Sequence, residues 1–203
     1  RRPPRSTPKP SSAASDVYKR QYQYRPTKYA DNPVMVADRP CEMGTIGGRH
    51  SGVEIVGQTV LYDDEEEVFK MWYVPWALER GKRPWCYATS TDGYNWDKPE
   101  LGLIEFQGDT RNNLLGIHGE PSYYNTFKDP RDPDPQRRYK ATGEMHVNGH
   151  QPPGGVVNAY SPDGIHWTCN NKAVVFYGPD VADAPSVLGW DPKREKYLSL
   201  IHI

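Results

Sequence analysis

The sequence predicts an all-β protein built from repeated antiparallel sheets. Residues 85–96 and 156–167 share one pattern, in which an apolar strand is followed by an Asp-Gly turn and then a tryptophan. Asp63, Asp129 and Asp191 each end an apolar run and recur at intervals of roughly 60–70 residues, which indicates a copied supersecondary unit. No long segment shows helical periodicity, so the pattern favours a β-propeller.

The elements of each repeat follow in a fixed order. A first strand ends at the repeated Asp, a polar turn follows, and an aromatic-rich second strand is expected at residues 69–73, 139–141 and 196–198. Third strands are expected at 85–90 and 156–160, with Asp92 and Asp163 as turn formers. The partial propeller domain then spans residues 34–198. It contains two and a half to three blades, at about 50–97, about 120–168 and, for the start of the third, about 180–198.

Composition supports short strands joined by many turns, because the chain has 14 Tyr, 6 Trp, 20 Pro and 18 Gly. Residues 1–21 are proline-rich and basic, cannot bury a core, and are predicted to be disordered. These residues and residues 199–203 are interpreted as non-native and are set aside. Cys41, Cys86 and Cys169 form no C-x-x-C pair and are predicted to be free thiols.

Charge and hydropathy exclude two classes of partner. Without residues 1–21 the chain is acidic, so the basic surface of a nucleic-acid-binding protein is not expected. No apolar run is long enough to span a membrane. No phosphate-binding loop is present, and Asn148-Gly149 prevents the helix on which His146 and His150 could bind zinc, so the sequence indicates no cofactor and no metal site.

Three carboxylates are the candidate catalytic residues. In a propeller the first strand of each blade lines the central channel, so pocket residues precede the repeated Asp by several positions. Counting back eight or nine residues gives Glu54, Glu120 and Asp183, one from each repeat. Glycoside hydrolysis requires such a set, because one acid protonates the leaving oxygen while a carboxylate attacks or activates water. The alternative for Glu54 and Glu120 is a solvent-facing position at a loop edge.

Four further residues are candidates for substrate binding. Arg49 and His50 precede the first strand of repeat one, and His118 lies two residues before Glu120. Asn125 lies on the first strand of repeat two. The repeated aspartates themselves are predicted to form Asx-type turns.

Four segments, residues 86–115, 127–141, 159–167 and 183–198, resemble the propeller domain of glycoside hydrolase families 32, 43 and 68. The resemblance implies a five-bladed propeller in the full protein, a glycosidase acting on a carbohydrate, and a secreted or periplasmic location. It also allows a calcium ion in the channel. Asp183-Ala-Pro-Ser-Val is similar to the start of inner strands in family 43, which implies a pocket role for Asp183. Asp129 resembles a transition-state stabiliser of families 32 and 68, although its repeat position favours a turn.

The sequence thus predicts hydrolysis of a poly- or oligosaccharide by Asp183, Glu120 and Glu54. The invertase-type nucleophile motif is absent, which argues against sucrose cleavage. Two alternatives remain open: a propeller that binds carbohydrate without cleaving it, and a protein-interaction propeller whose channel is structural.

Overall fold

The computed structural model describes residues 25–46, 49–51, 55–75, 83–118, 122–146, 154–177 and 186–200. The chain divides into two compact units, residues 1–32 and 33–203. In the described part of the first unit, a turn is closed by the backbone N–H and side-chain amide of Asn32, which both donate to the carbonyl of Tyr29. The described residues contain no helix long and apolar enough to cross a membrane.

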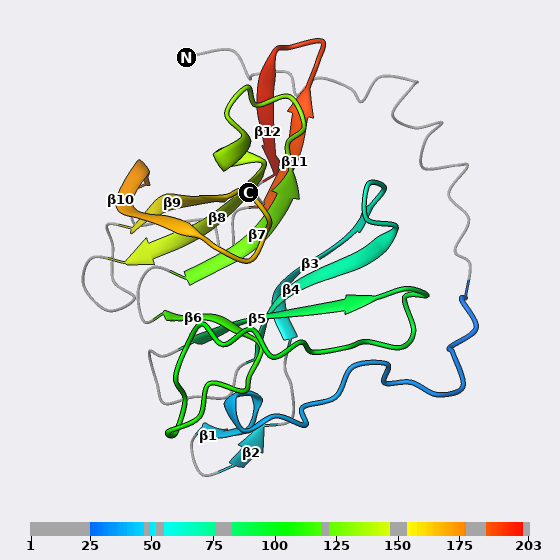
Figure 1. The fold of residues 1–203 in the computed structure, drawn as a ribbon. Coiled ribbons are helices and arrows are strands. Elements are labelled where there is room, and N and C mark those ends of the chain that lie inside the picture. Colours follow the sequence, from blue (N-terminus) through cyan, green and yellow to red (C-terminus); the bar gives the residue numbers. More distant parts are fainter. Residues whose placement is uncertain are drawn as a thin grey trace, which may run out of the picture. The chain divides into compact units, whose positions relative to one another are not determined.

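The second unit is all-β, and its strands form antiparallel sheets (Figure 1). The first four-stranded sheet has the order β3-β4-β5-β6, and the second has the order β10-β9-β8-β7. Two two-stranded sheets, β1-β2 and β11-β12, accompany them. The strands are β1 (Gly44–Ile46), β2 (Arg49–Ser51), β3 (Ile55–Asp63), β4 (Val68–Pro75), β5 (Arg83–Ser90), β6 (Leu114–His118), β7 (Ser122–Lys128), β8 (Tyr139–His146), β9 (Gly154–Ser161), β10 (Thr168–Tyr177), β11 (Ser186–Asp191) and β12 (Lys196–Leu200). Two short 3-10 helices, η1 (Pro40–Glu42) and η2 (Pro135–Arg137), complete the list of elements.

The predicted repeat is visible in the strand register. Asp63 pairs with Val68 and Asp191 pairs with Lys196, while the N–H of Asp129 donates to the carbonyl of Arg138. Each pairing of a first with a second strand also contains a register irregularity near the beginning of the first strand. The three hairpins β3-β4, β7-β8 and β11-β12 are therefore copies of one unit.

The sheets extend beyond the predicted blade boundaries. β6 pairs with β5, so the long connection after residue 97 joins two strands of one sheet and the first sheet continues to His118. In the same way β10 carries the second sheet to Tyr177. β12 includes Ser199 and Leu200, which the sequence analysis set aside; residues 1–21 and 201–203 lie outside the described residues.

The two Asp-Gly turns form the same hydrogen bonds. In the first, the Ser90 hydroxyl accepts from the N–H of Gly93 at 2.9 Å, and Asp92 Oδ1 accepts from the N–H groups of Tyr94 and Asn95. In the second turn the equivalent bonds are made by Ser161 and Asp163, with Gly164 donating at 2.8 Å. Trp96 and Trp167 each return an indole N–H to the glycine carbonyl of their own turn. The prediction of turn-forming Asp92 and Asp163 is confirmed.

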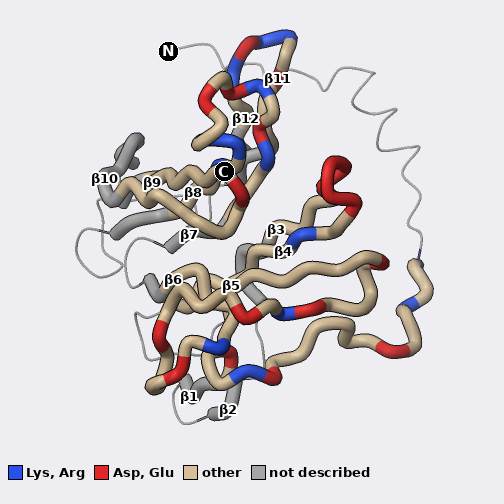
Figure 2. The backbone as a smooth tube through the Cα atoms, in the orientation of Figure 1, with Lys and Arg blue, Asp and Glu red and all other residues tan. Residues whose placement is uncertain are grey.

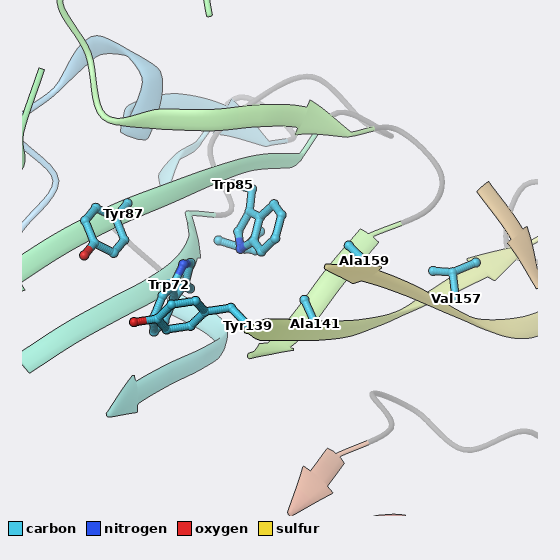
Figure 3. Packing of buried hydrophobic residues seen from close by; sticks show 8 residues of the cluster. Trp72, Trp85, Tyr87, Tyr139, Ala141, Val157 and Ala159 are labelled. Carbon is cyan, nitrogen blue, oxygen red and sulfur yellow. The ribbon is translucent and has the colours of Figure 1, made fainter. Parts of the chain in front are cut away.

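Aromatic side chains fill the core between the two four-stranded sheets (Figure 3). The first sheet contributes the large residues Trp72, Trp85 and Tyr87, and the second contributes Tyr139 with the small residues Ala141 and Ala159. The Trp72 ring lies 5.8 Å from that of Tyr139, and its indole N–H donates to the carbonyl of Gly164 at 2.7 Å. Large side chains on one sheet therefore pack into space left by small ones on the next.

The opposite face of the first sheet carries a second core. Cys41, Met71, Tyr73, Cys86, Ala88 and Leu114 are buried there, and the segment containing η1 supplies Cys41. Cys41, Cys86 and the half-buried Cys169 are free thiols, as the sequence predicts.

Candidate functional site

The three predicted catalytic carboxylates lie outside the described residues. The strands that follow them are described, however, and they begin close behind: β3 at Ile55 after Glu54, β7 at Ser122 after Glu120, and β11 at Ser186 after Asp183. Each candidate therefore precedes the first strand of its sheet in the sequence.

The first strands of the three sheets lie side by side and run in the same direction. β3 contacts β7, and β7 contacts β11. The N–H of Thr126 donates to Thr59 Oγ1 at 2.9 Å, and further along both strands Lys128 Nζ reaches Asp63 Oδ1 at 2.5 Å. Tyr197 of β12, which pairs with Trp190 near the end of β11, donates its hydroxyl to Asp129 just after the end of β7, at 2.5 Å. The ends marked by the repeated aspartates therefore share one edge, and the beginnings of the three strands share the opposite edge.

The four substrate-binding candidates occupy three different strands. Arg49 and His50 lie on β2, where they pair with Ile46 and Thr45. His118 is the last residue of β6, the strand farthest from β3 in its sheet, and it pairs with Arg83. Asn125 lies within β7, half-buried, opposite Thr142. The described strands thus do not group these residues on one element.

The repeated aspartates have a role that the sequence analysis did not predict. Asp63 Oδ1 accepts from the N–H of Glu65, which confirms a turn role, but its carboxylate is fully buried between the sheets. Lys70 of the same sheet donates to it at 2.9 Å. From the second sheet, the Tyr139 hydroxyl donates at 2.5 Å and Lys128 completes the group, which we call the first inter-sheet cluster.

A second inter-sheet cluster repeats this arrangement one sheet further on. Asp129 accepts from the N–H of Arg131 in its turn, pairs with Lys140 of its own sheet, and accepts from the hydroxyl of Tyr197 on β12. Lys140 also donates to Tyr197 at 2.8 Å. Asp129 thus joins two sheets, and this supports the structural role over the resemblance to a transition-state stabiliser.

The electrostatics of the clusters keep both carboxylates ionised. Burial alone raises the pKa of Asp63, but hydrogen bonds from Lys128, Tyr139 and Lys70 outweigh it and hold that pKa well below its usual range. Burial likewise acts against ionisation of Asp129, and Lys140 and Tyr197 still lower its pKa. Neither group is protonated near neutral pH, so neither has the character of a general acid.

The β3-β4 turn is rich in acidic residues (Figure 2), and they are exposed, so they extend the first cluster to the surface. Glu65 pairs with Lys128 at 3.0 Å and with Arg138, and Glu66 pairs with Lys70 at 2.6 Å. These partners come from both four-stranded sheets, so the charges at this edge connect the sheets.

A third buried group centres on Glu42, which is 0% exposed. Its carboxylate accepts from the Tyr73 hydroxyl, from Lys98 Nζ at 2.7 Å and from the N–H of Arg39 at 3.0 Å. Asn113 in turn donates to the Tyr73 oxygen at 2.7 Å. Every polar atom named has a partner, so we interpret this group as the attachment of the η1 segment to the first sheet. The sequence offered no periodic signal for it.

Within the described residues, no group of three or more His, Cys, Asp and Glu side chains is arranged to hold a metal ion. Comparison with known protein families finds no matching family model. A comparison with curated proteins finds no match either.

Proposed function

We propose that the chain forms part of a β-propeller that hydrolyses a glycosidic bond in a poly- or oligosaccharide, with Asp183, Glu120 and Glu54 as the acid/base set. The observation that carries the proposal is the arrangement of β3, β7 and β11. These adjacent strands run in one direction, and a carboxylate precedes each of them by one to three residues. Repeated four-stranded antiparallel sheets with matching turns and inter-sheet clusters support the propeller.

The chemistry follows from the grouping of the carboxylates. Where two or three of them share a confined edge, mutual repulsion raises the pKa of one, which then serves as proton donor to the leaving oxygen. A second, ionised carboxylate attacks the anomeric carbon or activates water. A spacing of about 5–5.5 Å between the pair gives retention, and about 6.5–9.5 Å gives inversion.

The test is hydrolysis of a panel of aryl glycosides by the purified protein and by Asp183→Asn, Glu120→Gln and Glu54→Gln. The proposal expects activity with at least one glycoside, a bell-shaped pH profile, and a loss of at least about 100-fold in kcat for Asp183→Asn. Glu105→Gln, at an exposed carboxylate on the connection before β6, is the matched control and retains full activity.

Either of two results would contradict the proposal and assign the chain to another functional class. Saturable binding of an oligosaccharide without turnover, weakened by Asp183→Asn, assigns the chain to the carbohydrate-binding class. Absence of both turnover and glycan binding, with the fold intact by circular dichroism, assigns it to the protein-interaction class.

A further inference from the structure

Two cysteines from distant parts of the chain meet in the second core. Along β5, Trp85 and Tyr87 face the core between the sheets, so Cys86 points to the opposite face of the first sheet. Cys41 belongs to η1, and its thiol donates to Asn113 Oδ1 at 4.0 Å. The same thiol accepts a hydrogen bond from Cys86. Contact between two thiols from separate elements is the arrangement that a disulfide bond requires.

Both thiols are closed to solvent while η1 is in place. Cys41 is 1% exposed and Cys86 is 0% exposed, and Met71, Ala88 and Leu114 complete the apolar surroundings. A reagent in solution therefore has no access to either sulfur in this state. Chemistry at the pair requires that the η1 segment first leave the sheet.

The η1 segment is the least buried part of this core. Within residues 33–43, only Cys41 and Glu42 are buried. The segment is held largely by polar contacts, namely those of Glu42 and the bond from the Arg39 guanidinium to the carbonyl of Lys98 at 3.0 Å. Opening free energies are lowest where few buried contacts hold an element. Undocking of η1 therefore costs less than unfolding of the sheet beneath it.

We propose that Cys41 and Cys86 form a disulfide bond under oxidising conditions, and that this bond attaches the η1 segment covalently to β5. The oxidant is a low-molecular-weight disulfide of the glutathione type, which meets Cys41 while the segment is undocked. An extracellular or periplasmic compartment is oxidising enough for such a bond to persist. The inference does not depend on glycoside hydrolysis.

The reaction is two successive thiol–disulfide exchanges. The Cys41 thiolate attacks one sulfur of oxidised glutathione, which forms a mixed disulfide and releases the first glutathione thiolate. The Cys86 thiolate then attacks the Cys41 sulfur and releases the second glutathione. The two protein thiols lose two electrons and two protons, and one glutathione disulfide is reduced to two thiols.

The test exposes the folded full chain, without denaturant, to an excess of oxidised glutathione. Remaining thiols are then blocked by alkylation, and the linkages are identified by peptide mass mapping. One disulfide between Cys41 and Cys86 is expected, reversible by dithiothreitol, with Cys169 recovered as a thiol because it packs against the other core. Absence of the Cys41–Cys86 linkage, its appearance only in urea, or equal pairing of either residue with Cys169 overturns the inference.

Cys86→Ala and Cys169→Ala are matched variants. Cys86→Ala is expected to stop at a glutathione adduct on Cys41, because the second exchange has no attacking thiol. Cys169→Ala is expected to form the same linkage as the unaltered chain. A Cys86→Ala chain that acquires no adduct, although its circular dichroism is unchanged, contradicts the proposed route through Cys41.

A second measurement needs no substitution. The N–H groups of Glu42 and Met43 close η1 by donating to the carbonyls of Arg39 and Pro40, so their hydrogen exchange reports undocking. Oxidation is expected to slow this exchange at least about tenfold and to leave that of β9 unchanged. The urea midpoint should rise by about 1 M, since the cross-link restricts the unfolded chain. Unchanged exchange at Glu42 and Met43 in the cross-linked chain would contradict covalent attachment of the segment.

Discussion

Asp63 combines a local and a long-range role in one side chain. One oxygen organises its turn through the N–H of Glu65, and the buried carboxylate collects donors from two sheets. Removing one member of a buried, hydrogen-bonded ion pair leaves the remaining charges without compensation, which costs several kcal/mol. Lys70 and Lys128 both pair with this carboxylate, and it is the only buried one that they contact among the described residues, because their other partners, Glu66 and Glu65, are exposed.

We therefore expect Asp63→Asn to lower the free energy of unfolding at pH 7 by about 3 kcal/mol. The pKa of Asp63 is depressed from 3.8 in the folded protein, so its stabilising effect is complete above about pH 5 and is lost as the pH falls below 3.8. The difference between wild type and Asp63→Asn should accordingly shrink with decreasing pH, as measured by urea denaturation at pH 7, 5 and 3.

Asp109→Asn is the control for this experiment. Asp109 also has a lowered pKa, about 2, because of Arg111, but that pair is exposed to solvent. Exposed ion pairs contribute little, so this variant should leave the unfolding free energy nearly unchanged. A difference for Asp63→Asn that stays constant from pH 7 to pH 3 would show that its carboxylate charge is not what stabilises the interface.

At the scale of an element, the two Asp-Gly turns are alike internally and differ in their surroundings. Gly93 and Gly164 have φ angles of 77° and 82°, in the left-handed region that favours glycine. A Cβ at Gly93 would lie 3.7 Å from Phe69, an ordinary contact, whereas a Cβ at Gly164 would lie 2.7 Å from Trp72. The second turn is thus also part of the contact between sheets.

Gly93→Ala and Gly164→Ala separate these two effects. In both variants the free energy of unfolding should fall by about 1–2 kcal/mol, because alanine is strained at a positive φ angle. Gly164→Ala should lower the free energy of unfolding by about 1–3 kcal/mol more, because Trp72 must move and its hydrogen bond to the Gly164 carbonyl is disturbed. Urea denaturation measures these changes in unfolding free energy. In a Trp72→Phe background, much of the difference between Gly93→Ala and Gly164→Ala should disappear. Equal losses in the wild-type background would mean that the turn tolerates a Cβ against Trp72.

Sequence periodicity predicted the parts of the fold whose signals are local. The turns at Asp92 and Asp163 and the aromatic second strands follow from residue type and spacing, and the structure confirms them. The fourth strands β6 and β10 were missed because one follows a long connection and the other contains the polar run Asn170-Asn171-Lys172. Glu42 and Lys98 were missed because a contact between distant residues leaves no periodic trace.

The candidate site was predictable only in outline. The repeat interval places Glu54, Glu120 and Asp183 just before three first strands, and the structure brings those strands together. The spacing of the carboxylates depends on loop conformations that periodicity does not encode. The same limit explains why the inter-sheet role of Asp63 and Asp129 was missed, since their lysine and tyrosine partners become neighbours only when the sheets pack.

At the scale of the whole molecule, the two inter-sheet clusters should differ in how far their disruption spreads. The first joins two four-stranded sheets that share an aromatic core, whereas the second joins the two-stranded β11-β12 sheet to the rest through β7 and Tyr197. Tyr139→Phe removes a hydroxyl that contacts both Asp63 and Lys70, and should lower global stability by about 1–2 kcal/mol.

Tyr197→Phe removes the equivalent hydroxyl from Asp129 and Lys140, but the sheet that carries it has few other attachments among the described residues. Its loss should open β11-β12 as a local unit, because opening free energies are lowest where few buried contacts hold an element. Hydrogen exchange should therefore accelerate across the amides of both four-stranded sheets in Tyr139→Phe, and across those of β11-β12 alone in Tyr197→Phe. Uniform acceleration in both variants would mean that the three sheets unfold as one cooperative body, with β11-β12 held as firmly as the other two.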